Sequence, residues 1–383
     1  MIPYGKQSIS EEDIAAVVQA LRSDYLTQGS RIDAFEAALC RYTGARYCVV
    51  VSNGTAALHL AMAALQLEPG SEGITSPITF AATANAMHYC GIAPVFADID
   101  TLTGNLCPTA TEQKISEHTR LLVPVHFAGQ AADMTRFHTL AQQHNLTIIE
   151  DAAHAIGSCY TDGSQVGNCR YSKATIFSFH PVKTITTAEG GAIMTNDPDY
   201  YARLRLLRSH GITKDEAALH QHPGPWYHEM QALGWNYRLT DLQAALGLSQ
   251  LQRLDEFKAR RQYLVERYND ALAHLPWLAT PVELAPGSSC FHLYVARFKF
   301  TQLGKTRTDV MQTLQRQGIG SQVHYIPVYH HPWYQAQRPY EPCQEAEHFY
   351  QECLSLPLYP TLTDEQQDMV IAAVRALDCG GNA

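Results

Sequence analysis

The chain has 383 residues, of which 46% are hydrophobic and 17% are charged, a balance typical of a folded globular protein rather than a disordered one. Its 28 basic and 37 acidic residues give a formal net charge of −9, which argues against a general nucleic-acid-binding protein, since such proteins present a basic face. The length exceeds that of one ordinary hydrophobic core and predicts two domains.

The sequence contains no pattern typical of a targeting segment or a metal site. No apolar run approaches the roughly 20 residues that a transmembrane helix needs, and the first residues lack the apolar stretch of a secretory signal peptide. The ten cysteines form no C-x-x-C pair and the 18 histidines form no H-E-x-x-H pattern, so no metal site is predicted. We therefore expect a cytoplasmic protein with free thiols and no membrane partner.

The first predicted helix covers residues 11–22. Ser10 is a suitable N-cap, and the acidic residues 11–13 suit the positive end of the helix dipole. Apolar residues recur on one face of this helix, at Ile14, Val17, Val18 and Leu21. A loop over residues 24–29 follows.

From residue 47 onward, short apolar runs alternate with helix-like segments. The predicted strands cover residues 47–51, 93–97, 121–125, 147–149, 174–179 and 192–194. The predicted helices between them cover residues 56–65, 81–89 and 134–144. This alternation predicts an α/β domain with a mostly parallel sheet, which we place at residues 1–250 together with the N-terminal segment.

The pattern changes to a long helical stretch over residues 240–268, with a bend expected inside it. Beyond it, the predicted elements are a strand at 292–300, a helix at 308–317, a strand at 322–325 and closing helices at 344–354 and 364–377. This mixture predicts a smaller α+β domain over residues 251–383.

Lys183 lies in a loop between two predicted strands, because the apolar run 174–179 precedes it and the pair Gly190 and Gly191 follows it. A lysine whose pKa is lowered can form a Schiff base with a carbonyl. A single lysine in a loop is more often a solvated surface charge, so this segment alone does not decide between the two interpretations.

Residues 49–58 form a strand that turns through Gly54 into an alanine-rich helix. The glycine lets the backbone approach a ligand, and Thr55 adds a hydroxyl beside free amides at the helix start, which together favour phosphate binding. An ordinary strand-to-helix turn has the same appearance.

Two further segments carry polar or aromatic groups at the ends of predicted strands. Residues 148–155 end a strand with the carboxylates of Glu150 and Asp151, followed by His154, at the edge of a sheet where α/β proteins bind ligands. Phe80 opens a helix and could cover a flat ring. Surface charge and core packing are the respective alternatives.

A polar loop with Asn236 and Arg238 leads into an apolar helix and supplies candidate ligand contacts, the alternative being helix capping and surface charge. Taken in chain order, a phosphate turn, an aromatic residue, an aspartate and a lysine stand near the ends of predicted strands. Pyridoxal phosphate needs this set, since it withdraws electrons while a carboxylate keeps its ring nitrogen protonated. The combination predicts this cofactor.

The chain resembles the sugar-nucleotide aminotransferases of fold-type I, the DegT/DnrJ/StrS family, over nearly its whole length. The resemblance is carried by residues 26–29, 76–80, 125–129, 177–191, 207–211, 234–247 and 322–327. It implies a large domain with a mixed, mostly parallel seven-stranded sheet and a smaller α+β C-terminal domain. Thr184 and Ala188 depart from the proline and glycine of many members, without removing a reacting group.

The resemblance also implies roles for individual residues. Lys183 would hold the cofactor as a Schiff base and move a proton between substrate and cofactor. Asp151 would pair with the pyridine nitrogen, His154 would lie beside the ring oxygen, and Phe80 would stack on the ring. The phosphate would be bound by Gly54, Thr55 and Ser178.

Asn236 is similar to the residue that reaches the cofactor phosphate of the other subunit, which implies a homodimer with shared active sites. Contacts to the sugar nucleotide are implied at Tyr4, Asp24, Tyr25, Leu26, Thr27, Gly54, Ser178, Asn236, His324, Tyr325, Ile326 and Pro327.

The resemblance is strongest to the members that serve pseudaminic acid biosynthesis. The implied reaction transfers the amine of L-glutamate to C4 of a UDP-linked 4-keto-6-deoxy-N-acetylhexosamine. An aminotransferase for another keto-sugar nucleotide is the alternative. Relatives that remove a hydroxyl carry histidine in place of the lysine, so Lys183 argues against a dehydratase, and its retention argues against a regulator without catalytic activity.

Overall fold

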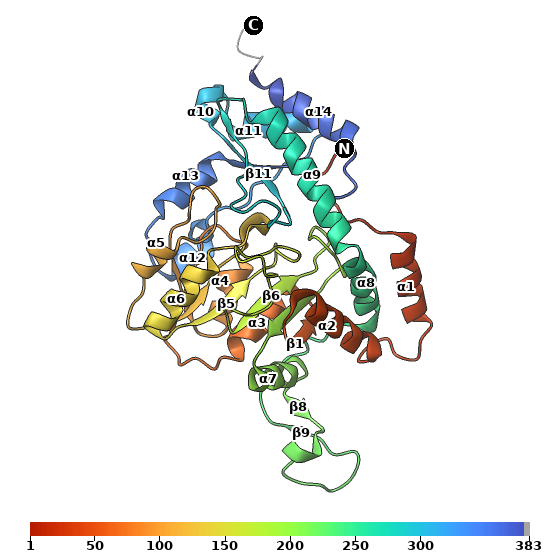
Figure 1. Ribbon diagram of the computed structural model, residues 1–383. Helices are drawn as coiled ribbons and strands as arrows, with labels where there is room; N and C mark the ends of the chain where they lie inside the picture. Colours follow the sequence, from red (N-terminus) through yellow and green to blue (C-terminus); the bar gives the residue numbers. More distant parts are fainter. Residues whose placement is uncertain (379–383) are drawn as a thin grey trace.

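The computed structural model describes residues 1–378, and a seven-stranded sheet lies at its centre (Figure 1). The strands run in the spatial order β1-β7-β6-β5-β4-β2-β3. Their bounds are β1 Tyr47–Val51, β2 Glu72–Thr75, β3 Ala93–Phe96, β4 Thr119–Val123, β5 Thr147–Asp151, β6 Ala174–Ser178 and β7 Gly191–Thr195. Along this order, β6, β5, β4, β2 and β3 pair in parallel with their neighbours. Strand β7 is antiparallel to both β6 and β1. The predicted α/β fold with a mixed, mostly parallel sheet is confirmed.

Helices cover both faces of this sheet and continue into the C-terminal part of the chain. Their bounds are α1 Glu11–Leu21, α2 Ser30–Thr43, α3 Gly54–Ala63, α4 Ala82–Tyr89, α5 Pro108–Glu112, α6 Met134–His144, α7 Pro198–Arg208, α8 Asp241–Gln252, α9 Leu254–Leu272, α10 Phe300–Leu303, α11 Arg307–Arg316, α12 Pro332–Gln337, α13 Gln344–Glu352 and α14 Asp364–Arg375. Short 3-10 helices cover Phe127–Gly129, Glu216–Ala218 and Val328–His330.

Alternate residues of the central strands face two different cores. In β1, Val50 belongs to the core that contains Phe35 of α2. Its neighbour Val49 belongs to the core that contains Leu58 of α3. Side chains of a strand alternate between the faces of a sheet, so the helices bury both faces, as a largely parallel sheet requires.

The first helix begins as the sequence predicts. Ser10 caps α1 by accepting a hydrogen bond from the backbone N–H of Asp13, whose carboxylate accepts one from the Ser10 N–H in return. Asp13 is also bound by the side chain of Gln250, at 2.6 Å, which ties the start of α1 to α8. The cap therefore stabilises both the helix and its attachment to the rest of the chain.

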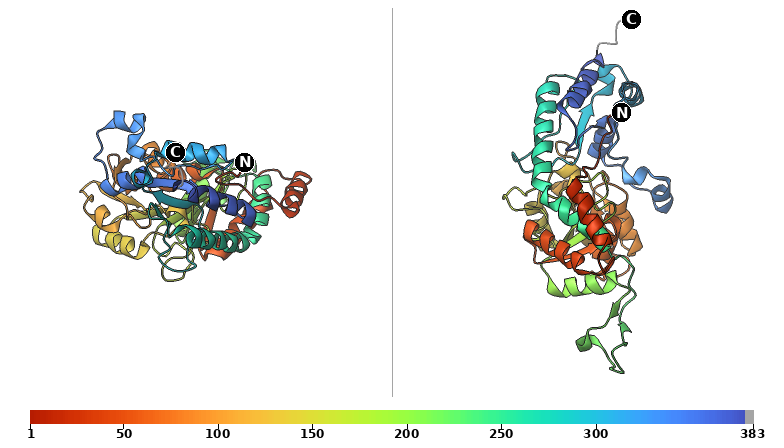
Figure 2. Two further views of the ribbon diagram at one scale, coloured as in Figure 1. Left: turned by 90° about the horizontal axis from the view of Figure 1, so that it is seen from above. Right: turned by 90° about the vertical axis from the view of Figure 1, so that its right-hand side faces the viewer.

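The predicted long helical stretch is divided into α8 and α9 by Arg253, whose φ of −102° and ψ of 4° lie outside the helical range. The first residues of α9, Leu254 and Phe257, pack in the core of the large sheet. Further along the same helix, Leu264 and Tyr268 pack in a separate core. Figure 2 shows α9 running from one part of the molecule to the other.

The second core lies under a small antiparallel sheet of three strands. These are β10 Leu278–Ala279, β11 Tyr294–Phe298 and β12 Cys353–Leu356. Ile2 joins this core and pairs with Ile319, so the first residues of the chain pack with its C-terminal part. The domain division at residue 250 stays a prediction.

The strand predicted over residues 322–325 is wrong. Gln322 pairs with Ser355 through an isolated bridge, and the chain then leaves the sheet. Residues 322–325 alternate between polar and apolar side chains, which is typical of a strand. In the structure His324 and Tyr325 line a cavity instead of packing against a sheet face.

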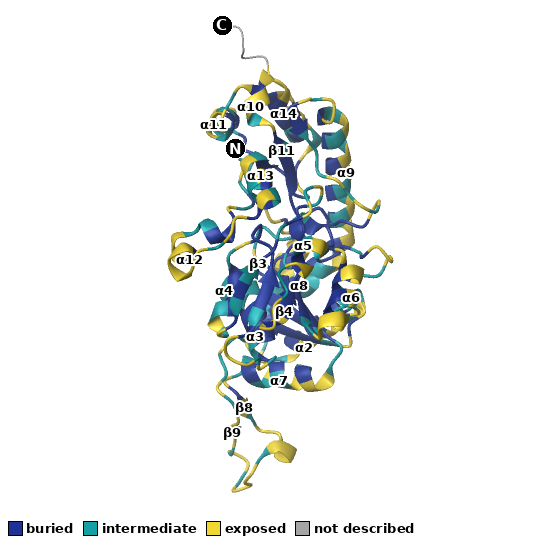
Figure 3. Cartoon of the chain, turned by 90° about the vertical axis from the view of Figure 1, so that its left-hand side faces the viewer, coloured by how far each residue is buried: buried dark blue, intermediate teal, exposed yellow. Residues whose placement is uncertain are grey.

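Residues between α7 and α8 project from the molecule (Figure 3). This projection contains the two-stranded pair β8 Ile212–Thr213 and β9 Glu229–Met230, and its Trp226 is 70% exposed. Within residues 1–378, no helix combines the length and the apolar character that crossing a membrane would require.

Candidate active site

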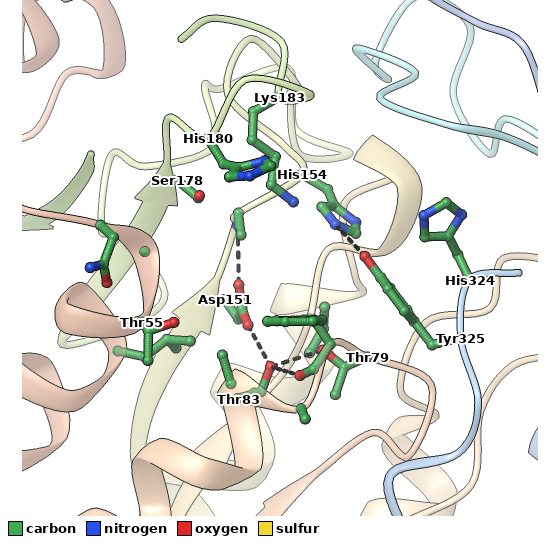
Figure 4. A pocket seen from close by; sticks show the side chains of 18 of the residues that line it. Thr55, Thr79, Thr83, Asp151, His154, Ser178, His180, Lys183, His324 and Tyr325 are labelled. Carbon is green, nitrogen blue, oxygen red and sulfur yellow. Dashed lines mark hydrogen bonds between the residues drawn. The ribbon is translucent and has the colours of Figure 1, made fainter. Parts of the chain in front are cut away.

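A cavity of about 1020 Å³ lies at the carboxyl ends of β5 and β6, between the large sheet and the C-terminal part of the chain (Figure 4). Open α/β sheets bind ligands at this edge because loops and helix N-termini converge there. Asp151 ends β5 and Ser178 ends β6, and both line the cavity. Its size is that of a site for a cofactor and a small substrate together.

Lys183 lies in the loop between β6 and β7, and its amine points into the cavity (Figure 4). Its backbone N–H donates to the carbonyl oxygen of His180 at 2.8 Å, which fixes the turn that presents the side chain. Desolvation lowers the pKa of the amine to about 8, against an opposing effect of the Asp151 charge. A much larger share of Lys183 is therefore unprotonated near neutral pH than of a surface lysine.

Asp151 is 4% exposed and held from two directions. One carboxylate oxygen accepts from the hydroxyl of Thr83 at 2.7 Å, and the other accepts from the N–H of Ala153 at 3.1 Å. Burial raises the pKa of this carboxyl, and these two hydrogen bonds and the charge of Lys183 oppose the rise. Glu150, the adjacent carboxylate, points away from the cavity and accepts from His126 at 2.8 Å, because successive side chains of β5 face opposite sides.

His154 follows β5 and hydrogen-bonds through both ring nitrogens. Nδ1 lies 3.3 Å from the backbone N–H of Ala128, which can only donate, so Nδ1 accepts. Nε2 lies 3.1 Å from the hydroxyl of Tyr325. Burial lowers the pKa of the ring well below its usual value, which favours the neutral form with hydrogen on Nε2. With hydrogen on Nε2, His154 donates to the hydroxyl oxygen of Tyr325, and the hydroxyl hydrogen of Tyr325 stays available to a ligand at the cavity wall.

The start of α3 forms a cradle suited to a phosphate. Asn53 caps the helix by accepting from the N–H of Ala56, at 2.8 Å, and the N–H groups of Gly54 and Thr55 have no partner among the described residues. A Cβ at Gly54 would lie 2.8 Å from the Cβ of Ser178, so only glycine permits this approach. Free N–H groups at a helix N-terminus bind anions. The residues present therefore fit the phosphate of pyridoxal phosphate.

Phe80 is 62% exposed at the edge of the cavity, with its ring centroid 6.3 Å from that of Tyr325. This placement agrees with a ring that covers a flat cofactor. Tyr4, His324, Tyr325 and Ile326 also line the cavity, and their contacts to a sugar nucleotide stay a prediction.

Other predicted site residues lie outside the cavity formed by one chain. Residues 24–27 are exposed, and Thr27 pairs with Thr240. Asn236 is exposed and pairs with Ser209, whereas Arg238 pairs with Val51. Pro327 is buried beside the cavity without lining it. The roles assigned to these residues stay predictions.

The structure also brings residues to the site that sequence reasoning did not select. Thr83 binds Asp151, and Thr79 bonds to Thr83 at 2.8 Å. The available signal for Thr83 is its place in the first turn of α4, three residues after Phe80, which precedes the helix. His292 lines the cavity just before β11, and no sequence pattern marks it.

Residues 7–375 match the DegT/DnrJ/EryC1/StrS aminotransferase family. The chain belongs to this family. It is 40% identical to the spore coat polysaccharide biosynthesis protein SpsC of Bacillus subtilis (strain 168) over 384 aligned positions, which cover 100% of this chain and 98% of the relative.

Solved structures of the family superpose closely on this chain. PseC of Helicobacter pylori, an aminotransferase involved in pseudaminic acid biosynthesis, has a TM-score of 0.92 at 33% identity and covers 98% of each chain. The PLP form of Spr1654 from Streptococcus pneumoniae has a TM-score of 0.90 at 29% identity and covers 100% of each chain. Family membership confirms the predicted aminotransferase activity and the predicted pyridoxal phosphate cofactor.

Proposed function

We propose that the protein transfers the amino group of L-glutamate to C4 of UDP-2-acetamido-2,6-dideoxy-β-L-arabino-hex-4-ulose. The products are UDP-4-amino-4,6-dideoxy-N-acetyl-β-L-altrosamine and 2-oxoglutarate, so nitrogen and oxygen exchange between the two substrates. The similarity to PseC, at 33% identity over 98% of the chain, supports this acceptor and a place in pseudaminic acid biosynthesis.

One observation carries the amino-transfer part of the proposal. The amine of Lys183 and the carboxylate of Asp151 lie in the same cavity, and each influences the pKa of the other. An unprotonated amine beside a fixed carboxylate is the arrangement that this chemistry requires.

Pyridoxal phosphate supplies an aldehyde that captures amines and a protonated ring that stabilises negative charge on an adjacent carbon. Asp151 would hold the ring nitrogen protonated, and the Gly54, Thr55 and Ser178 cradle would bind the phosphate. Nζ of Lys183 would take the proton from the α-carbon of glutamate and later return one to C4 of the sugar. Because the same amine serves both half-reactions, we expect ping-pong kinetics.

A second candidate is amino transfer to a different keto-sugar nucleotide. The observation that favours it is the greater identity to SpsC, 40%, a protein of spore coat polysaccharide biosynthesis. The segments around Asp24 and His324, where we place the sugar contacts, would distinguish the two acceptors.

The experiment that separates these candidates uses purified enzyme with glutamate and a panel of 4-keto and 3-keto sugar nucleotides. Product mass, read by mass spectrometry, reports amine gain for each acceptor. We expect the UDP-linked 4-keto-6-deoxy-N-acetylhexosamine to be aminated with the highest kcat/KM. Preference for another acceptor would contradict the sugar assignment, and absence of amine gain with every acceptor would contradict the proposed function.

We further propose a cytoplasmic homodimer with shared active sites. Exposure of Asn236 outside the cavity of its own chain supports this arrangement, because a residue there is available to a neighbouring subunit. Residues 24–27, also exposed and outside the cavity, would contribute sugar contacts in the same way.

A further inference from the structure

Three histidines gather on the side of the cavity that faces the C-terminal part of the chain. His154 follows β5, His292 precedes β11, and His324 lies in the segment that leaves the small sheet. The rings of His154 and His292 have centroids 4.5 Å apart. Figure 4 shows His154 and His324 on the same side of the cavity, with Tyr325 beside them.

Protein contacts occupy both ring nitrogens of His154 and one of His324, whereas neither ring nitrogen of His292 has a hydrogen-bond partner among the described residues. His154 is bonded to Ala128 and Tyr325, and Nδ1 of His324 lies 2.7 Å from the hydroxyl of Ser355. His292 is 3% exposed, and its Nδ1 is buried without a hydrogen-bond partner. A buried polar atom without a partner is unfavourable and uncommon, unless a ligand completes it.

A buried cation lies against the backbone of His292. Arg261 of α9 is 1% exposed and donates to the carbonyl oxygen of His292 at 3.1 Å and to that of Phe291 at 3.3 Å. It forms no ion pair with a carboxylate in the part of the chain that the structure describes. Backbone carbonyl oxygens, that of Leu358 at 3.0 Å included, solvate this guanidinium, but no carboxylate of the described residues neutralises it, so its positive charge favours an anion nearby.

Apart from Lys183, the described residues that line the cavity offer a carboxylate no permanently charged cation. Among the described lining residues there is no arginine, which is the side chain that proteins most often use for this purpose. Asp151 and Glu189 repel anions from their own parts of the wall. Lys183 is the reacting amine.

We infer that the imidazole of His292, backed by the buried charge of Arg261, binds a carboxylate of the amino donor. This inference rests on the proposed function, since it names the donor half of the same site. A carboxylate would accept a hydrogen bond from the imidazole, and its negative charge would be attracted by the positive charge of Arg261. Glutamate carries two carboxylates, and a carboxylate is the negatively charged hydrogen-bond acceptor that the protein itself does not supply to His292 and Arg261.

The test compares His292→Phe, which removes the donor at nearly constant size, with His292→Asn, which keeps an N–H donor. His88→Phe is the matched control, because His88 packs against Trp333 and Tyr334 and its Nε2 is also buried without a partner, but it does not line the cavity. Titration calorimetry of the holoenzyme measures binding of glutarate, an unreactive dicarboxylate. Absorbance of the cofactor follows each half-reaction separately.

We expect His292→Phe to weaken glutarate binding and to raise KM for glutamate by about tenfold or more, the loss typical of one charged hydrogen bond. His292→Asn should recover part of this loss, and His88→Phe should match the wild type. The keto-sugar half-reaction should change less than about twofold in all three variants.

Unchanged glutarate binding in His292→Phe, or an equal loss in both half-reactions, would overturn the inference, as would failure of the wild type to bind glutarate. These outcomes differ from failure of the proposed function, which appears as absence of amine gain in the wild type with every acceptor. Thermal unfolding and cofactor absorbance of each variant report whether the fold is kept.

Discussion

Lys183 and Asp151 illustrate how burial and charge compete at single residues. Burial favours the neutral amine and the neutral carboxyl, whereas attraction between the two charges favours both ionised forms. For Lys183 burial is the larger effect, and its pKa falls to about 8 from an ordinary 10.5. The lysine is thus prepared to act as a nucleophile and base near the pH at which the protein would work.

Cofactor capture by the cofactor-free enzyme should follow the deprotonation of Lys183. We expect its rate to rise with pH through a midpoint of about 8, since only the neutral amine attacks the aldehyde. Stopped-flow absorbance of pyridoxal phosphate measures this midpoint. In Asp151→Asn the midpoint should move below that of the wild type, because the carboxylate charge that raises the lysine pKa is gone.

Lys183→Ala is the control for this experiment, because it removes the titrating amine. A wild-type midpoint near 10 would contradict the lowered pKa. A midpoint that rises in Asp151→Asn would contradict the coupling between the two residues.

At the scale of elements, the close approach of α3 to β6 shapes the phosphate cradle. Gly54 begins the helix at the point where Ser178 ends the strand. The two free N–H groups of the first helical turn lie beside the Ser178 hydroxyl at the cavity wall. The cradle therefore depends on the distance between the two elements.

Gly54→Ala should separate them. Alanine favours a helix over glycine by about 1 kcal/mol at most, but its Cβ would lie 2.8 Å from the Cβ of Ser178, and such overpacking costs about 1–3 kcal/mol. We expect a lower melting temperature and a Kd for pyridoxal phosphate about tenfold higher, measured by thermal unfolding and by absorbance titration.

Gly5→Ala is the matched control, because its Cβ would meet Val182 at an ordinary 3.8 Å. It should leave both the melting temperature and the cofactor Kd near those of the wild type. An unchanged Kd in Gly54→Ala would show that the cradle does not depend on this contact.

Elements with strong local patterns were predictable from the sequence, and elements specified by their neighbours were not. The strand Tyr47–Val51 and the helix Met134–His144 have the predicted bounds, because an apolar run and a 3.6-residue period specify them locally. The strand β2 was not predicted. Its Gly73 is explained by Met87, whose sulfur would lie 2.9 Å from a Cβ there, and this contact exists only after folding.

At the scale of the whole molecule, the structure places predicted site residues in two groups. Lys183 and Asp151 line the cavity, whereas Asn236 is exposed outside it. A symmetric dimer can bring the second group of one subunit to the cavity of the other. In the proposed homodimer, the two groups would belong to one active site built from two chains.

Complementation tests this arrangement. We expect Lys183→Ala and Asn236→Ala each to impair both sites of their own dimers. In dimers that contain one chain of each, one site has both native residues. After mixing, unfolding and refolding, we expect about a quarter of the wild-type activity. Activity no greater than the sum of the separately refolded variants would contradict shared sites.

Active-site residues that belong to local sequence motifs could be predicted, and those that depend on distant partners could not. Lys183, Asp151 and His154 belong to local motifs next to strand ends, and the structure brings them to one cavity. Thr83 and His292 were not selected, because their importance depends on partners far away in the sequence, Asp151 for one and the Arg261 charge for the other. Only the folded chain creates these pairs.

The helix α9 has a mechanical consequence for the cavity. Its first turn is anchored in the core of the large sheet, and the turns from Leu264 onward are anchored in the core of the small one. Rotation of one part against the other would therefore bend this helix or pull one of its ends from its core. Helix α9 therefore limits how far the large sheet and the C-terminal part of the chain can move relative to each other. The width of the cavity between them, into which the sugar substrate must fit, depends on the length of this one continuous helix.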